Sequence, residues 1–192
     1  MKLSSIIEKK LLSLVKDIFV NNPWDFKHTL STVKAMKEIA GAEWANERIL
    51  LTVMYLHDIG YAGKLKENYT LGERISVKKE HMNLGAKKAS EILEKLKFSS
   101  EEKEKIIHLI SVHDKLDELS TRDELLVLEA DSLGQIDPSV GNNFGEEEFA
   151  KYVKIFEEKR VPKFITRTGK KLLLEYAHNN ERYQKYTTLF KK

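Results

Sequence analysis

The scarcity of helix-breaking residues constrains the fold of this chain more than any other feature. Its 192 residues include only three prolines and nine glycines, which separate long runs rich in Leu, Lys, Glu and Ala. Those four residue types are strong helix formers, whereas proline and glycine disfavour helix interiors. We therefore predict an all-α fold, a helical bundle with no strand.

Turn and capping signals divide the chain into successive helices. The predicted ranges are 3–20, 23–40, 44–59, 77–97, a helix capped by Ser99 or Ser100, a helix from about 121 to 134, and two more at 146–158 and 166–178. The clearest break is the segment Gly141 to Gly145. At this length one domain is expected. We interpret residues 1–192 as a single domain in which residues 141–192 form a C-terminal helical appendage.

Composition excludes several classes of protein. With 33 basic and 30 acidic residues, the net charge of +3 gives no strong nucleic-acid or membrane-surface signal. The absence of cysteine excludes thiolate metal sites and thiol nucleophiles. The stretch from Ile49 to His57 is too short to cross a bilayer, which needs about 20 residues. We expect a soluble cytoplasmic protein with no membrane partner, and the sequence gives no indication of its oligomeric state.

Side chains of the metal-ligand type occur in one order along five of the predicted helices and their ends. They are His28, His57, Asp58, His81, His113 and Asp131. Helical spacing puts each histidine on an apolar stripe and Asp131 beside buried-type residues. A choice arises between two histidines of one helix. At about 100° per residue, His113 points with the isoleucines of that helix, whereas His108 points almost oppositely.

A single histidine on an apolar face is more often a hydrogen-bonded core residue than a metal ligand. The convergence of several such groups changes this interpretation, because six buried polar groups without a metal would need an elaborate hydrogen-bond network. Imidazole and carboxylate are ligands that iron, manganese, zinc, nickel and cobalt accept. We therefore predict that these six residues form a site for a divalent transition metal.

The motifs around these residues carry a specific resemblance. The chain contains His28, Leu56-His57-Asp58-Ile59-Gly60, Glu80-His81-Met82-Asn83-Leu84-Gly85, Ile110-Ser111-Val112-His113-Asp114 and Glu129-Ala130-Asp131-Ser132-Leu133-Gly134. Over residues 24–137 it resembles the HD superfamily of metal-dependent phosphohydrolases. The resemblance implies an HD-domain helical bundle in which His28, His57, Asp58 and Asp131 hold a first metal. In members with two metals, residues matching His81 and His113 hold a second, and the aspartate of the doublet bridges them.

The expected activity follows from that resemblance. Two cations about 3.5 to 4 Å apart activate a water and stabilise both oxygens of an in-line displacement. We expect hydrolysis of a phosphomonoester, phosphodiester or nucleotide by a metal-bound hydroxide, without a covalent enzyme intermediate. Asp58 would bridge the metals and orient the nucleophile.

Cationic residues near the expected opening are candidates for binding the phosphate of a small phosphorylated substrate. They are Lys64, Lys66, Arg74, Lys78 and Lys115, with Lys115 the first choice, also as a catalytic group, and Arg74 the second. Most such residues are solvated surface cations. A further cluster, Lys163, Arg167, Lys170 and Lys171, is interpreted as a charged outer helix face.

Departures from known subfamilies narrow the substrate by exclusion. Hydrolases of the guanosine tetraphosphate alarmone carry acids where this chain has Tyr61 and Ala62, and dinucleoside tetraphosphate hydrolases carry a basic residue at the place of Tyr61. Cyclic diguanylate phosphodiesterases have a His-His pair where this chain has His113-Asp114. Small 5′-deoxynucleotidases use one metal. The best match is to small stand-alone HD hydrolases.

Two alternatives share the same ligands. Some HD-fold proteins with four histidines and two aspartates hold a mixed-valent di-iron pair and oxidise small organic substrates with oxygen. The other alternative is a non-catalytic module in which metal or nucleotide binding regulates a partner. Phosphate release without oxygen would separate the hydrolase from the oxygenase.

Overall fold

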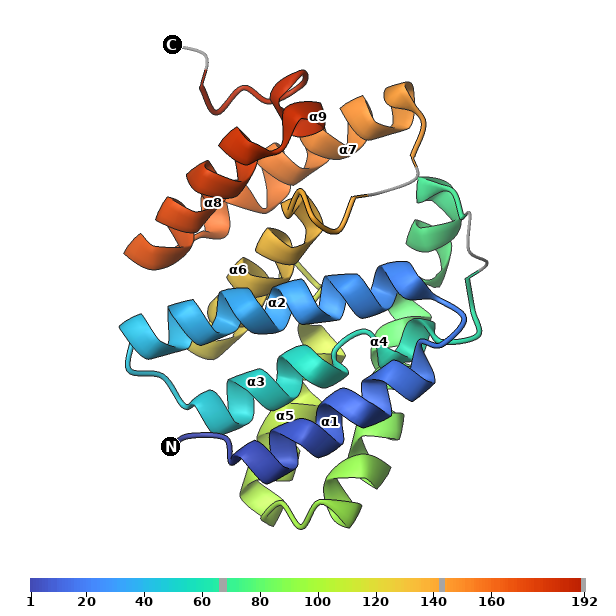
Figure 1. Ribbon diagram of the computed structural model, residues 1–192, viewed down its shortest axis with the longest axis vertical. Helices are drawn as coiled ribbons and strands as arrows, with labels where there is room; N and C mark the ends of the chain where they lie inside the picture. The colour runs from blue at the N-terminus through green and yellow to red at the C-terminus, as the bar shows by residue number, and fades with distance from the viewer. Residues whose placement is uncertain (66–68, 142–143, 191–192) are drawn as a thin grey trace.

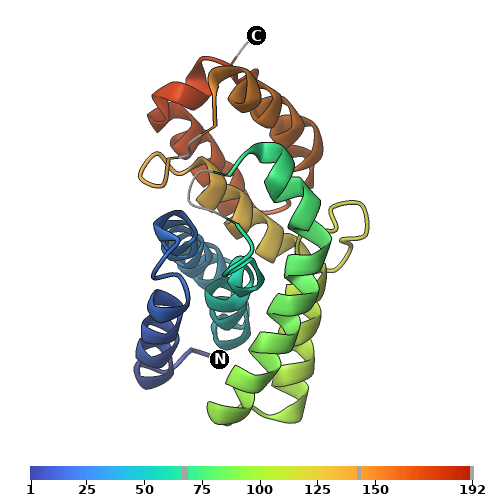
Figure 2. The same ribbon diagram turned by 90° about the vertical axis from the view of Figure 1, so that its right-hand side faces the viewer.

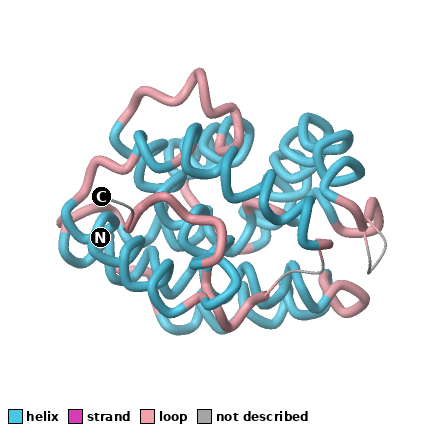
Figure 3. The backbone as a smooth tube through the Cα atoms, turned by 90° about the horizontal axis from the view of Figure 1, so that it is seen from above, coloured by secondary structure: helices cyan, strands magenta, loops and turns pink. Residues whose placement is uncertain are grey.

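The computed structural model describes residues 1–65, 69–141 and 144–190. These ranges are largely helical and contain no strand, which confirms the all-α prediction (Figure 3). The helices are α1 (Ser5–Ile18), α2 (Pro23–Ala42), α3 (Glu47–Leu56), α4 (Leu71–Lys95), α5 (Ser100–Val112), α6 (Arg122–Ile136), α7 (Glu146–Lys159), α8 (Arg167–Asn179) and α9 (Glu181–Gln184), with 3-10 turns η1 (Ile59–Tyr61) and η2 (Val161–Lys163). None of the described helices has the length and apolarity needed to span a membrane.

Side-chain caps set the starts of several helices. Thr70 with Glu73 and Ser99 with Glu102 form capping boxes, in which each side chain bonds the backbone of the other. The box at Thr70 starts α4 at Leu71, so the start predicted at residue 77 is wrong. The helix predicted from residue 44 begins later, at Glu47, because Trp44 has a positive φ of 53°.

The core lies between α2, α3 and α6, with α4 and α5 packed as a pair beside them (Figures 1 and 2). Helix α3 is apolar on all sides, and every residue from Ile49 to Leu56 is buried. Helix α2 lies along both α3 and α6. The polar residues buried among these apolar helices are therefore held by backbone that has little freedom to move.

Helices α7, α8 and α9 gather at one end of the molecule in Figure 1. Helix α8 packs on α6 and α2. The buried side chain of Glu129 on α6 accepts hydrogen bonds from the backbone N–H groups of Ile165 and Thr166, at the start of α8. The C-terminal helices are thus fastened to the helix that carries Asp131. The predicted break at 141–145 includes residues 142–143, which lie outside the described residues.

Candidate metal centre

The structure brings the six ligand-type residues together from five elements of the fold. His28 is on α2, His57 and Asp58 directly follow α3, His81 is on α4, His113 directly follows α5, and Asp131 is on α6. All six are buried. They form a first group, His28, His57 and Asp131, and a second group, Asp58, His81 and His113.

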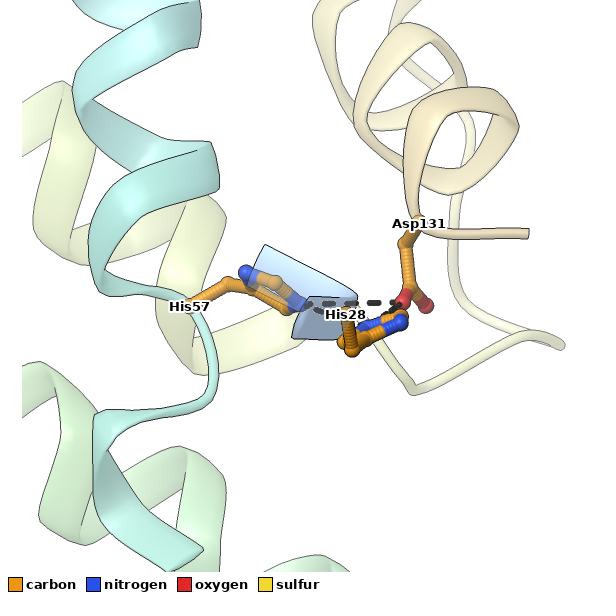
Figure 4. Close-up of side chains that lie close together, drawn as sticks. All are labelled: His28, His57 and Asp131. Atoms are coloured by element: carbon orange, nitrogen blue, oxygen red, sulfur yellow. Dashed lines mark hydrogen bonds and ion pairs between the residues drawn. The ribbon is translucent and has the colours of Figure 1, made fainter. Parts of the chain in front are cut away.

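In the first group the ligand atoms face one another at short range (Figure 4). His28 Nε2 lies 3.0 Å from Asp131 Oδ1 and 3.3 Å from His57 Nε2. His57 Nε2 lies 3.6 Å from Asp131 Oδ1. Three residues from three different helical segments therefore converge on one point.

The second group converges in the same way around Asp58. His81 Nε2 and His113 Nε2 are 3.2 Å apart, and they lie 3.3 Å and 3.5 Å from Asp58 Oδ1. The other carboxylate oxygen, Asp58 Oδ2, lies 3.6 Å from His28 Nε2 and 3.5 Å from His57 Nε2. One oxygen of Asp58 thus faces each group.

Two of the histidines are oriented by the ends of the helices they follow. His57 Nδ1 lies 2.9 Å from the carbonyl oxygen of Met54, and His113 Nδ1 lies 2.7 Å from that of Ile110. The last carbonyl groups of a helix have no helical partner and accept other donors. Since a carbonyl only accepts, each Nδ1 carries a hydrogen, and in the neutral imidazole each Nε2 presents a lone pair to the site.

The other two histidines are held by stacking. The ring of His28 lies parallel to that of Trp24, with centroids 5.1 Å apart, and the ring of His81 stacks on Tyr61 at 3.8 Å. Within the described residues the Nδ1 atoms of His28 and His81 have no hydrogen-bond partner. On the Nδ1 side of these two rings, aromatic packing therefore takes the place of a hydrogen bond.

Both carboxylates are ionised and are held by arginines. Asp131 Oδ2 accepts a 2.8 Å hydrogen bond from Arg160, and Asp58 Oδ2 accepts one of 3.2 Å from Arg74. Burial opposes ionisation of both acids, but the neighbouring histidines and arginines hold the pKa of each well below its ordinary value. The site therefore contains two buried negative charges.

Arg160 is the residue that sequence reasoning missed. It ends α7 and is 6% exposed, and its guanidinium binds Asp131, Ser132 and Asp114. Although burial opposes ionisation of Asp114, Arg160 and Lys78 hold its pKa below the usual value. Nothing in the local sequence, Glu157-Glu158-Lys159-Arg160, distinguishes this arginine from a surface residue, because its partners lie far earlier in the chain.

The donor set fits divalent transition metals. Each group offers imidazole nitrogens and carboxylate oxygen, the mixed ligands that such ions accept. The Nε2 lone pairs of His57 and His113 face other Nε2 atoms and the Asp58 carboxylate. These electron-rich atoms repel one another, and a cation bound between them would remove that repulsion. His57 shows that the site favours positive charge. Burial opposes protonation of its ring, but Asp58 and Asp131 raise the pKa of His57 to about 9.

Two glycines allow the close approach of helices at the site. A Cβ atom on Gly134 of α6 would lie 2.4 Å from Thr32 Cγ2 and 3.1 Å from the ring of His28. A Cβ atom on Gly60 would lie 1.9 Å from the carbonyl oxygen of His81. Only glycine permits both contacts.

A cavity of about 270 Å³ opens beside the two ligand-type groups. Asp58, His113 and Asp131 line it, together with the cations Arg74, Lys78 and Arg160. Arg74 is also held by Asp25, 3.2 Å away, and lies 4.2 Å above the ring of Tyr61. The predicted substrate-binding residue Arg74 thus lies in the cavity.

Lys78 also lines the cavity, but Lys64 and Lys115, two other predicted phosphate-binding lysines, lie outside it. Lys64 pairs with Glu80 at 2.7 Å and Lys115 with Glu118 at 3.6 Å, and neither lines the cavity. Lys115 is only two residues beyond His113, but the chain has left α5 and turns there, with Lys115 N bonded to the Val112 carbonyl. Lys66 lies outside the described residues.

The remaining predictions concern residues away from the site. His108 has a side chain that is 56% exposed and pairs with Glu124, and His178 is exposed. Arg167, Lys170 and Lys171 are exposed on α8. The structure thus places these residues, as predicted, outside the ligand groups.

A comparison with protein families agrees with this geometry. A family model described as the HD domain matches residues 25–136, and the chain belongs to the HD domain family. This confirms the resemblance and the fold class expected from the sequence. Membership, with the two ligand groups, supports the general class of metal-dependent phosphohydrolase.

Two solved structures of the HD domain of the phosphodiesterase PgpH from L. monocytogenes are similar to the chain. One is 16% identical, with a TM-score of 0.48, and the match covers 88% of this chain and 98% of that chain. The other, in complex with cyclic-di-AMP, is 13% identical, with a TM-score of 0.45 and coverage of 94% and 98%. No curated protein matches the chain.

Proposed function

We propose that the chain is a phosphohydrolase with a dinuclear centre, which acts on a small phosphorylated substrate. One divalent transition metal would be held by His28, His57 and Asp131, and the other by His81 and His113, with Asp58 shared between them. Iron, manganese, zinc, nickel and cobalt all suit these ligands.

One observation carries this proposal: the Asp58 carboxylate lies between the two groups, with Oδ1 toward one and Oδ2 toward the other. A carboxylate in this position can bridge two cations. A pair of bound metals supplies an activated water and charge stabilisation in phosphoester hydrolysis.

The residues of the cavity favour water as the nucleophile. The described lining contains no Ser, Thr or Cys side chain. Its tyrosines, Tyr61 and Tyr152, are poor nucleophiles, because burial raises the pKa of each phenol well above its ordinary value. A covalent enzyme intermediate is therefore not part of the proposal.

Arg74 is our choice for contact with the phosphate. Its guanidinium lies beside Asp58 and lines the cavity, and Asp25, Tyr69 and the Tyr61 ring hold it in place. A planar guanidinium held in this way can donate two hydrogen bonds to phosphate oxygens without losing much side-chain freedom. Lys78, which pairs with Asp114 at 3.3 Å, is the second choice. Lys64 and Lys115 pair with acids outside the cavity, so we no longer place phosphate binding or catalysis on them.

The proposal is tested by measuring metal content and phosphate release on the same preparations, purified without chelator. We expect two metal equivalents in the wild type and turnover of at least one phosphoester in a broad panel. Asp58→Ala should lose most of both metals and at least about 1000-fold in kcat, equivalent to about 4 kcal/mol. Asp117→Ala, which changes an exposed aspartate outside the site, is the matched control. Full metal content and activity in Asp58→Ala would refute the dinuclear assignment.

An anaerobic repeat with iron-loaded protein separates hydrolysis from oxygenation. We expect unchanged phosphate release, because water alone completes a hydrolysis. Activity that appears only with oxygen, toward a substrate without phosphate, would establish the di-iron oxygenase alternative instead. Metal binding without turnover in either assay would establish the regulatory module.

A further inference from the structure

Part of the cavity wall, called here the apolar wall, is formed by apolar side chains and reaches the surface. Leu71 and Ile75 of α4 face the same cavity as Ile155 and Phe156 of α7. Ile75 is 55% exposed and Ile155 is 49% exposed. Large aliphatic side chains from two distant segments are therefore open to solvent at the same cavity.

Single exposed apolar residues are common on protein surfaces and need no explanation. An apolar surface continuous with a cavity that also contains convergent polar groups is the usual form of a ligand site. Here Ile75 and Ile155 are continuous with buried Phe156, and the polar groups are the metal ligands and arginines. The cavity lining therefore combines exposed and buried apolar side chains with convergent polar groups.

The cations that line the cavity are already paired with acids. Within the described lining the cations are Arg74, Lys78 and Arg160, and the acids are Asp58, Asp114 and Asp131. Each cation pairs with at least one of these acids. Bound metals would supply the positive charge for one phosphate group. A chain of phosphates would bring further negative charges that no unpaired cation of the described lining neutralises.

The cavity is also small. Its volume of about 270 Å³ lies just below the 300–1,000 Å³ typical of sites for drug-sized ligands. A phosphate with one compact ring or a short alkyl group is of suitable size.

Resting on the function proposed above, we propose that the substrates are monophosphate esters of a compact apolar or aromatic alcohol, and that Ile75 and Ile155 select for that group. Nucleoside triphosphates and other polyphosphates are disfavoured. Hydrolysis would break the bond between phosphorus and the ester oxygen, with the oxygen of water added to phosphorus and its proton carried to the leaving alcohol.

Binding is measured first, with probes that cannot be hydrolysed. On metal-loaded protein we expect phenylphosphonate to bind about tenfold more tightly than methylphosphonate, since only the former reaches the apolar wall. Metal content is measured before and after each titration. Equal affinities for the two phosphonates would overturn the proposal.

The variant Ile155→Glu places a charge on the apolar wall without changing any ligand of the metals. We expect about a tenfold rise in the KM for phenyl phosphate and less than a twofold change for the polar ester glycerol 2-phosphate. Leu174→Glu, at a leucine 48% exposed on α8, is the matched control and should change neither. Equal effects of Ile155→Glu on both esters, or a wild-type preference for ATP over phenyl phosphate, would contradict selection by the apolar wall.

The two proposals fail differently. If phenylphosphonate binds selectively and Ile155→Glu removes that selectivity, but no ester is hydrolysed, the ligand class holds and the proposed hydrolase function is wrong. If esters are hydrolysed without preference for an apolar group, the hydrolase function holds and the selection is wrong.

Discussion

The two ligand groups of the centre are built alike but supported differently. The first group contains its own carboxylate, Asp131, which is bound by Arg160 and also by Gln135 at 3.1 Å. The second group has no carboxylate except Asp58, which it shares with the first.

This difference predicts unequal metal affinity. A cation in the first group would meet two carboxylates, since Asp58 Oδ2 also faces it, whereas a cation in the second would meet one. Outer residues that orient ligands commonly change metal affinity by about 10- to 100-fold. We therefore expect the first group to fill before the second, and the following predictions test that order.

Removal of the metals should give the largest effect. The buried carboxylates of Asp58 and Asp131 would then lie close together without metal ions between them, and activity should be lost. A ligand present at a thousandfold excess over its Kd stabilises the folded state by about 4 kcal/mol. For a chain of this size, this corresponds to roughly 10 °C in Tm. Thermal unfolding during re-addition of metal should show two steps, and a single step at two equivalents would contradict unequal groups.

Separate removal of one histidine from each group should reveal which group fills first. We expect His81→Ala to keep about one metal equivalent with nearly wild-type affinity, because His28, His57, Asp58 and Asp131 remain. His28→Ala should weaken the tighter equivalent and so change the first phase of a calorimetric titration. His178→Ala, at an exposed histidine of α8, is the control. The opposite pattern would mean that the second group binds more tightly.

Substitution of Arg160 should affect the first group more than the second. Arg160→Met keeps much of the buried side-chain volume but removes the positive charge that pairs with Asp131 and Asp114. We expect a 10- to 100-fold loss of affinity for the first metal equivalent and a much smaller change in the second.

Arg160→Lys should restore part of that affinity, because a lysine keeps the positive charge but not the paired geometry. Calorimetry on both variants gives the measurement. An equal loss in both equivalents would indicate a general loss of structure in place of a specific effect on Asp131.

A smaller effect is expected when a side chain is added to α6 where it packs against His28. Gly134→Ala forces a shift against Thr32 and the His28 ring, which should cost about 1–3 kcal/mol of stability. The affinity of the first group should fall a few-fold, and that of the second should stay unchanged. Gly41→Ala meets no atom within 4 Å and provides the control. Chemical denaturation and metal titration of both variants decide the outcome.

The helices, and the direction of each ligand-type side chain relative to the apolar stripe of its helix, could be predicted because both depend on local spacing. His113 rather than His108 faces the site because the apolar stripe of α5 sets its direction, and this stripe is visible in the sequence. The start of α4 was also encoded locally, in Thr70 and Glu73, although the predicted helix began later.

The partners of the carboxylates could not be predicted, because they depend on long-range packing. Arg160 reaches Asp131 across 29 residues of sequence, and Glu129 of the same helix α6 also binds the backbone at the start of α8. Arg74 was recognised as a cation near the site, but its contacts with Asp25 and Asp58 require α4 to lie against two other segments. Lys115 was predicted to lie at the site because it is close in sequence to His113. Helix α5 has ended before Lys115, so its distance from His113 along the sequence does not determine the direction of its side chain.

The position of Arg160 also has a consequence for biosynthesis. During translation His28, His57, Asp58, His81 and His113 are made before Asp131, and Arg160 is made 29 residues after Asp131. It also lies beyond residue 136, where the match to the HD family model ends. The Asp131 carboxylate therefore receives its arginine only after all six ligand-type residues have left the peptidyl-transferase centre. A chain released before residue 160 would carry all six of them and lack the charge that holds Asp131 in place.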